Sequence, residues 1–214
     1  MNTLFNTLKY EMIQKNNTQE DKDWIGNYQN ICVTNGFANL RKTERIQHDY
    51  YATEPKAAEL LLELETFGNV WECACGGGHL ANVFRKHNIL GRESDLIDRY
   101  GNEVLNFLYN QEKWEGDIVT NPPYKYSLQF IDMALKSVYQ QNKVAMLLPI
   151  RYLEGLERRK FYAKNPPKTV YVSSGRLQCA YNGDFTKRTQ SAVCYMWVVF
   201  EKGYKGKTVL KWFN

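Results

Sequence analysis

The sequence is poor in the residues that build metal centres and disulfide scaffolds. Its 214 residues include five cysteines and three histidines, no Cys-x-x-Cys pair occurs, and the histidines are not spaced as in zinc proteins. An odd number of cysteines in a chain of this size favours reduced thiols, so we expect no metal site. Zinc deaminase chemistry is also excluded, because the Pro-Cys-x-x-Cys signature is missing.

Long apolar segments are missing as well. The longest near-continuous apolar run, residues 192–200, is far shorter than the roughly 20 residues that cross a bilayer. The first residues lack a basic start followed by an apolar block, so we expect no secretory signal, no membrane partner and a cytoplasmic location. With 43% hydrophobic and 24% charged residues, the composition is that of a globular domain with a full core.

Positive charge is concentrated in the last third of the chain. Residues 150–190 contain nine Lys or Arg against three Asp or Glu, whereas residues 51–149 contain nine against thirteen. A localised basic region is typical of proteins that bind polyanions, although a solvated helix face gives the same pattern. The residues that we expect to contact nucleic acid are Arg151, Arg158, Arg159, Lys160, Arg176, Lys187 and Arg188.

From residue 50 onward, apolar strands alternate with amphipathic helices. Strands are predicted within 69–75, 89–97, 104–108, 117–120, 143–150, 169–173 and 192–200, and helices after an N-cap at Thr53 and over 79–86, 126–139 and 152–163. The alternation predicts an α/β fold with a mostly parallel sheet and an antiparallel edge strand. Residues 1–45 are polar and Asn-rich, and we interpret them as an extension of a single domain over residues 46–214.

The most specific motif is Asn121-Pro122-Pro123-Tyr124, which directly follows the apolar strand 117–120. Prolines fix φ and lack an N–H group, and a residue before proline is held extended. The result is a stiff corner at the carboxyl end of a strand, where α/β sheets bind ligands. Asn-Pro-Pro recurs at residues 165–167, but without a preceding apolar strand, so we expect no function there.

A second motif is a strand that ends in glycines, residues 70–78. Gly76 and Gly78 allow the backbone to approach a cofactor closely, although a simple strand-to-helix turn gives the same pattern. Asp95 follows Gly78 by 17 residues at the end of the next strand, where a carboxylate can accept hydrogen bonds from ribose hydroxyls. Asp98 is the alternative residue for that role.

Together these motifs resemble the phage and prophage group of DNA adenine-N6 methyltransferases over roughly residues 45–214. Residues 121–124 resemble the family's catalytic signature, and Glu72, Gly76 and Gly78 resemble its first cofactor motif. Residues 50–55 resemble the motif that covers the methionine end of S-adenosylmethionine (AdoMet), while Asn106 stands where the family commonly has an Asp. The resemblance implies a Rossmann-like AdoMet-methyltransferase fold with cofactor contacts from Tyr51, Thr53, Glu72, Cys73, Gly76, Gly78, Asp95 and Asn106.

The resemblance also implies a mechanism of direct transfer. Asn121 and Pro122 would accept hydrogen bonds from the adenine N6 amine and favour a pyramidal nitrogen whose lone pair can attack. Tyr124 would stack on the extracted base. The implied activity is that of a site-specific DNA-methyltransferase acting on adenine N6, with DNA as partner, as a monomer or homodimer. No separate recognition domain follows residue 124, so sequence reading would fall to residues 151–190.

Several alternatives stay open at this point. Asn-Pro-Pro-Tyr also occurs in methyltransferases of glutamine side chains, and related motifs occur in RNA adenine and cytosine-N4 enzymes. The basic segment argues against a protein acceptor, and Asn instead of Ser at position 121 leans away from cytosine. A nucleic-acid-binding protein that keeps the scaffold without turnover is the remaining alternative.

Overall fold

The computed structural model describes residues 51–181, 185 and 193–214. The expected extension over residues 1–45, as well as Lys187 and Arg188, lies outside these residues. In chain order the elements are β1 (Tyr51–Thr53), α3 (Lys56–Leu64), β2 (Val70–Glu72), α4 (His79–Lys86), β3 (Leu90–Asp95), β4 (Glu103–Val104), η2 (Phe107–Tyr109), β5 (Ile118–Thr120), η3 (Tyr124–Tyr126), α5 (Ser127–Ser137), β6 (Lys143–Pro149), η4 (Ile150–Leu153), α6 (Leu156–Lys164), β7 (Thr169–Ser173), β8 (Cys179–Tyr181), β9 (Tyr195–Glu201) and β10 (Val209–Phe213).

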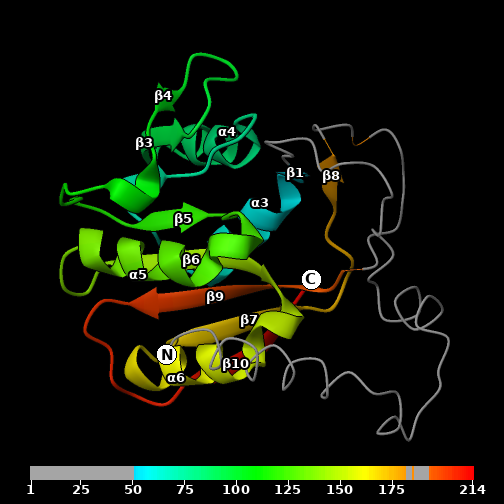
Figure 1. The fold of residues 1–214 in the computed structure, drawn as a ribbon. Coiled ribbons are helices and arrows are strands. Elements are labelled where there is room, and N and C mark those ends of the chain that lie inside the picture. The colour runs from blue at the N-terminus through cyan, green and yellow to red at the C-terminus, as the bar shows by residue number, and fades with distance from the viewer. Residues whose placement is uncertain (1–50, 182–184, 186–192) are drawn as a thin grey trace, which may run out of the picture. The chain divides into compact units, whose positions relative to one another are not determined.

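The main sheet of the described residues has eight strands in the order β10-β7-β9-β6-β5-β2-β3-β4 (Figure 1). Neighbouring strands are parallel, except that β9 is antiparallel to both β6 and β7. The predicted α/β fold with a mostly parallel sheet is therefore confirmed. The antiparallel strand lies toward the end of the sheet that β7 and β10 form.

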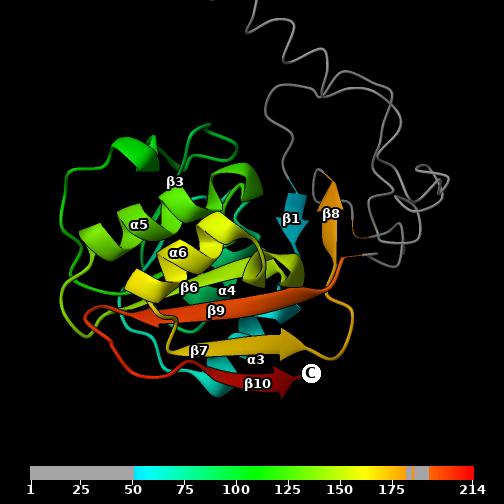
Figure 2. The same cartoon turned by 60° about the horizontal axis from the view of Figure 1, so that its bottom comes forward.

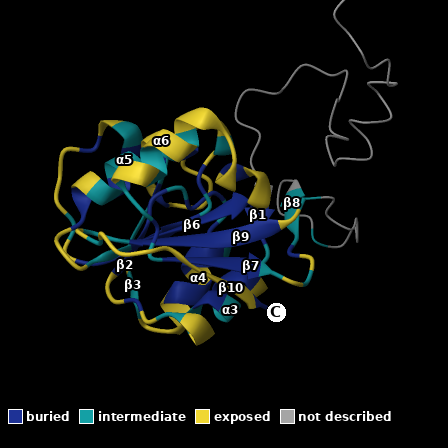
Figure 3. Cartoon of the chain, turned by 90° about the horizontal axis from the view of Figure 1, so that it is seen from below, coloured by how far each residue is buried: buried dark blue, intermediate teal, exposed yellow. Residues whose placement is uncertain are grey.

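Helices cover both faces of this sheet. Figure 3 shows buried strands between α5 and α6 on one side and α3 and α4 on the other. Along β6, Val144, Met146 and Leu148 pack into one apolar cluster, while Ala145 and Leu147 pack into a second. Successive residues of a strand point to opposite faces, so a strand covered on both sides must be apolar throughout. This explains why the β6 segment is apolar at nearly every position.

A short antiparallel ribbon joins β1 to β8, and it lies at the end of the sheet where β7 and β10 terminate (Figure 2). Thr53 pairs with Cys179, and the Glu54 backbone N–H donates to the Gln178 carbonyl at 3.0 Å. The predicted N-cap at Thr53 is therefore wrong. Thr53 belongs to the ribbon, and the N-cap of α3 is Pro55, with no side chain capping the helix.

The predicted strand over residues 104–108 is only partly present. β4 ends at Val104, and η2 begins at Phe107. The reason is the Asn106 side chain, whose Oδ1 accepts a hydrogen bond from the Leu108 backbone at 3.2 Å and turns the chain. Asn at this position stabilises a turn more effectively than an extended strand.

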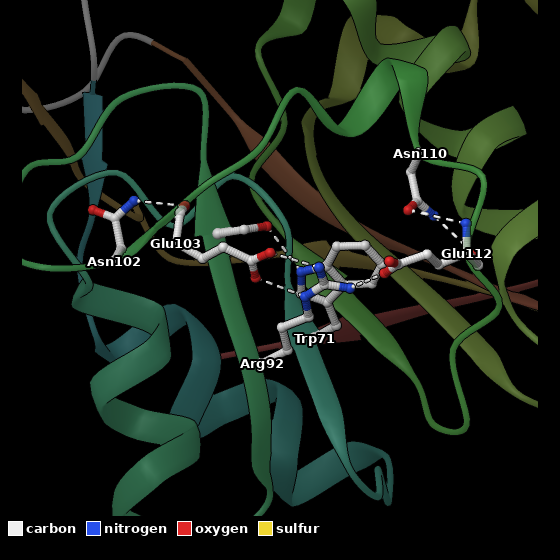
Figure 4. A network of polar contacts seen from close by, with 7 residues as sticks. Trp71, Arg92, Asn102, Glu103, Asn110 and Glu112 are labelled. Carbon is white, nitrogen blue, oxygen red and sulfur yellow. Dashed lines mark hydrogen bonds and ion pairs between the residues drawn. The ribbon is translucent and has the colours of Figure 1, made fainter.

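Arg92 fixes the position of β3 and β4 beside β2 (Figure 4). Its guanidinium lies 4.3 Å from the centroid of the Trp71 ring and forms ion pairs with Glu103 and Glu112. The Trp71 indole N–H donates to Ser94 Oγ at 2.9 Å. These contacts set the spacing of β2 and β3, which end at Glu72 and Asp95, two of the predicted cofactor contacts.

Candidate active site

The two main sequence motifs meet where the chain reverses direction across the sheet. β2 lies between β3 and β5, and the chain builds the sheet outward from β2 on both sides. Carboxyl ends of strands at such a switch point form the crevice in which open α/β sheets bind ligands. β2 leads into the glycine turn, and β5 leads into residues 121–124.

A pocket lies between these two segments. It is lined from β1, from the two turns and from the start of α4, by Ala52, Thr53, Glu72, Ala74, Cys75, Gly76, His79, Leu80 and Asn121. The structure thus brings Thr53, Glu72 and Asn121 together, although up to 68 residues separate them along the chain. We call this space the first pocket.

Asn121 is oriented by a contact from the β1–β8 ribbon. Its Nδ2 donates to Thr53 Oγ1 at 2.7 Å, which leaves Oδ1 as the available acceptor of the amide. Asn121 Oδ1 is buried and has no hydrogen-bond partner among the described residues. A buried polar atom without a partner costs about 1–3 kcal/mol, so its presence here is typical of a binding site for a hydrogen-bond donor.

The glycine turn needs glycines at two positions. Gly76 and Gly78 have φ values of 53° and 76°, in the region that side chains disfavour. A Cβ added to Gly78 would lie 2.7 Å from Cζ of Tyr100. The Asp95 carboxylate accepts hydrogen bonds from the Gly76 backbone at 2.9 Å and from the Ile97 backbone at 3.2 Å. Asp95 therefore shapes the turn itself.

Glu72 presents an unusual carboxyl group to the pocket. The side chain is fully buried, and Oε1 accepts a hydrogen bond from the Ala74 backbone at 3.1 Å. Oε2 is buried and has no partner among the described residues. Burial raises the pKa of Glu72 to about 8. The site therefore favours a ligand group that is positively charged or donates a hydrogen bond at Oε2.

His79 is a pocket residue that the sequence analysis did not single out. It is the first residue of α4, and its Nδ1 is buried without a partner among the described residues. Burial lowers the pKa of His79, which favours the neutral ring. Its position directly after the glycine turn is the sequence signal that could have identified it.

Other predicted cofactor contacts lie elsewhere. Cys73 is buried in the apolar cluster on the side of α5, and burial raises the pKa of its thiol. Alternation along the chain turns Glu72 to the pocket and Cys73 to the core. Asn106 is exposed at the start of η2, and the Tyr51 backbone pairs with Tyr181 in the ribbon.

The rest of the Asn-Pro-Pro-Tyr motif is firmly packed. Pro122 is buried and Pro123 exposed. The Tyr124 ring lies 5.9 Å from Tyr152 and 6.4 Å from Tyr195, measured between centroids, and burial raises its pKa. The Tyr152 hydroxyl donates to the Tyr124 carbonyl at 3.0 Å, which fixes the end of the corner.

The second Asn-Pro-Pro has a different structural setting. Asn165 is the C-cap of α6, where its backbone N–H donates to the Phe161 carbonyl at 2.9 Å. Prolines that follow a helix end in this way terminate the helix. The same tripeptide thus ends a helix at residues 165–167 and forms a pocket wall at Asn121.

The predicted nucleic-acid contacts that fall in the described residues lie mainly on the surface. Arg151, Arg159, Lys160 and Arg176 are exposed, whereas Arg158 is half-buried. The described residues contain no cluster of three or more His, Cys, Asp or Glu placed to hold a metal ion. None of the described helices has both the length and the apolar character of a membrane span.

No protein-family model matches the chain, and a search of the curated proteins also finds no match. Solved structures do match. The M protein of the type I restriction enzyme EcoKI superposes with a TM-score of 0.51 at 16% identity, over 72% of this chain and 44% of that chain. The type IIG restriction endonuclease BpuSI gives 0.54 at 12% identity, over 76% and 26%. A SAM-dependent O-methyltransferase from Thermotoga maritima gives 0.47 at 12%, over 80% and 71%.

The chain thus spans less than half the length of the two restriction proteins. At these identities the similarity establishes the fold and not the substrate. The mostly parallel sheet and the structural matches establish the fold: the chain has the α/β fold of Rossmann-like AdoMet-dependent methyltransferases.

Proposed function

We propose that this protein transfers a methyl group from AdoMet to the N6 amine of adenine in DNA. The observation that carries the proposal is the buried Oδ1 of Asn121, which has no hydrogen-bond partner in the described part of the chain. Thr53 orients the Asn121 amide, and Asn121 shares a pocket with the glycine turn. An acceptor fixed in advance at a stiff corner is the group needed to hold an amine hydrogen during alkylation.

The residues of the first pocket fit AdoMet. AdoMet carries an ammonium and a sulfonium group, and Glu72 offers a buried carboxyl oxygen to which no described residue donates a hydrogen bond. Gly76 lines the pocket and has no side chain of its own, so a cofactor can approach the backbone there, whereas the Tyr100 ring lies against Gly78. The chemistry that AdoMet supplies when bound is an electrophilic methyl group on a sulfonium sulfur, which becomes a neutral thioether when the methyl leaves.

The chain's own residues prepare the acceptor amine. Asn121 Oδ1 and the Pro122 carbonyl are the two acceptors that grip its hydrogens and favour a lone pair outside the ring plane. The amine gains the methyl group and gives up one proton to solvent. Thr53 holds the Asn121 amide so that its oxygen, and not its NH2 group, faces the amine. If the amide were inverted, the Asn121 NH2 group would face the acceptor amine, and two hydrogen-bond donors would point at each other.

Two observations support DNA as the substrate. Two of the structural matches with TM-scores above 0.5 are proteins of restriction enzymes. The described part of the basic segment also exposes Arg151, Arg159 and Arg176 to solvent. RNA adenine, cytosine N4 and protein glutamine are acceptors of related chemistry, and they enter the test as its other outcomes.

The test is incubation with methyl-labelled AdoMet and, separately, duplex DNA, structured RNA and a mixed protein substrate. Digestion to nucleosides or amino acids then identifies the labelled product. The proposal predicts N6-methyladenine from DNA. If the label appears in RNA, in N4-methylcytosine or in methylglutamine, the protein is a methyltransferase but its acceptor is not adenine N6 in DNA. AdoMet binding without transfer to any acceptor would indicate a scaffold that has lost turnover.

A further inference from the structure

A second pocket lies beside the same corner. It has a volume of about 330 Å³ and is lined by Tyr124, Lys125, Ser127, Leu128, Gln129, Tyr152 and Arg158. Asn121 lines the first pocket and Tyr124 lines the second, so the four-residue corner has one end in each. The α-carbons of these two residues lie at most about 11 Å apart, since they are three residues apart.

The second pocket is positively charged. Its lining residues include two cations, Lys125 and Arg158, and no carboxylate. Neither cation forms an ion pair within the described residues, whereas Lys160 on the same helix as Arg158 pairs with Glu157 at 2.7 Å. A partly buried cation without a neutralising carboxylate favours an anionic ligand.

Arg158 is held in one orientation. Its guanidinium carbon lies 4.0 Å from the centroid of the Tyr152 ring, and Nη1 donates to the Glu154 carbonyl at 2.9 Å. A guanidinium that stacks on an aromatic ring keeps its remaining N–H groups in a planar fork, which matches the oxygens of a phosphate. Tyr152 in turn donates to the Tyr124 carbonyl, so Arg158 is coupled to the corner through one ring.

The opposite wall adds further donors. Ser127, Leu128 and Gln129 form the first turn of α5, whose N-terminus no side chain caps. The helix dipole favours negative charge at this end, where the Ser127 N–H already donates to the Tyr124 carbonyl. Lys125, directly before the helix, is exposed. Cations and donors from η3, α5 and α6 thus converge on one cavity.

We propose that the second pocket binds a backbone phosphate of the DNA strand that carries the target base, with Arg158 as its main contact and Lys125 as a supporting one. This inference rests on the function proposed above, because the first pocket then holds the cofactor and the corner holds the amine. A phosphate beside Tyr124 fixes the position of the strand while its base reaches Asn121.

The experiment measures affinity for a fluorescent 20-base-pair duplex of mixed sequence between 50 and 200 mM salt. We expect Arg158→Gln to weaken binding about tenfold and to reduce the salt slope by about one unit, as loss of one phosphate contact does. Arg158→Lys keeps the charge and should preserve the slope. Lys164→Gln is the matched control, because Lys164 is an exposed cation on α6 outside the pocket.

Because Arg158 packs on Tyr152, its variants are also checked by thermal unfolding. Lys125→Gln provides an independent measurement, since the Lys125 side chain is exposed and its removal leaves no cavity. A threefold or larger loss of affinity is expected for it. If both Gln variants retain native affinity and salt slope, as Lys164→Gln does, the phosphate site is refuted.

Failure of this inference is distinguishable from failure of the proposed function. If the native protein methylates DNA and Arg158→Gln has the same kcat/KM, the phosphate site is refuted and the proposed function stands. If the native protein does not methylate DNA but Arg158→Gln loses DNA binding, the proposed function is refuted and the phosphate site stands. A second series uses duplexes that the protein methylates, each with one phosphate replaced by an uncharged methylphosphonate. At one position the replacement should weaken DNA binding by the native protein but not by Arg158→Gln.

Discussion

Thr53→Val is the sharpest perturbation of the proposed acceptor geometry. Valine has the shape of threonine and suits a strand, so the β1–β8 ribbon and the packing around this buried residue are retained. The change removes the oxygen that accepts the 2.7 Å hydrogen bond from Asn121 Nδ2. Among the described residues, Asn121 then has no hydrogen bond that distinguishes the two orientations of its amide.

The expected magnitude follows from the cost of that lost contact. A buried donor without a partner costs about 1–3 kcal/mol, and each 1.36 kcal/mol in the barrier is about tenfold in rate. We therefore expect the rate of methyl transfer under single-turnover conditions to fall about 10- to 100-fold. Thr53→Ser keeps the hydroxyl and should retain a rate within a few-fold of the native protein.

The same variants separate two roles for Thr53. The sequence resemblance places it among the cofactor contacts, whereas the structure places its hydroxyl on Asn121. If Thr53 positions Asn121, titration calorimetry of Thr53→Val should give an AdoMet affinity within a few-fold of native while kcat falls. A large loss of AdoMet affinity with an unchanged single-turnover rate would refute the positioning role.

Three further predictions concern Glu72, Gly78 and the basic segment. Because burial raises the folded-state pKa of Glu72 from 4.5 to about 8, the folded chain holds an extra proton between these values, and this contribution to stability is lost as pH rises from about 5 to 8. Glu72→Gln should remove that pH dependence in thermal unfolding, and an equal slope in both proteins would contradict it. Gly78→Ala should cost more than the about 1–2 kcal/mol that its positive φ implies, because the added Cβ would lie 2.7 Å from Tyr100 Cζ, and the resulting shift of the turn should weaken AdoMet binding. Gly101→Ala, with a φ of 91° and open space around the added Cβ, should show only the cost of the positive φ. DNA affinity should fall steeply with salt, and salt-independent binding would exclude the basic segment as its source.

Elements with strong local patterns were predictable from the sequence. α4 and β7 have the predicted bounds, 79–86 and 169–173, because each has an apolar pattern that local packing reinforces. The corner at residues 121–124 was also predictable, because two prolines determine backbone geometry without help from distant residues.

Features that depend on distant contacts were not predictable. β1 and β8 are short strands that pair with each other across more than 120 residues, so neither shows a local pattern. The bond between Asn121 and Thr53 spans 68 residues, and without it the orientation of the amide is undetermined. The bond from Gly76 to Asp95 likewise exists only once β2 and β3 lie side by side.

The central claim is that the Asn121 amide oxygen grips the acceptor amine. It is tested most directly by comparing Asn121→Ala with Asn165→Ala, the equivalent change in the second Asn-Pro-Pro, in single-turnover reactions read out as N6-methyladenine in DNA. We predict loss of transfer in Asn121→Ala with AdoMet affinity kept within a few-fold, and native transfer in Asn165→Ala. Native transfer by Asn121→Ala would contradict the account.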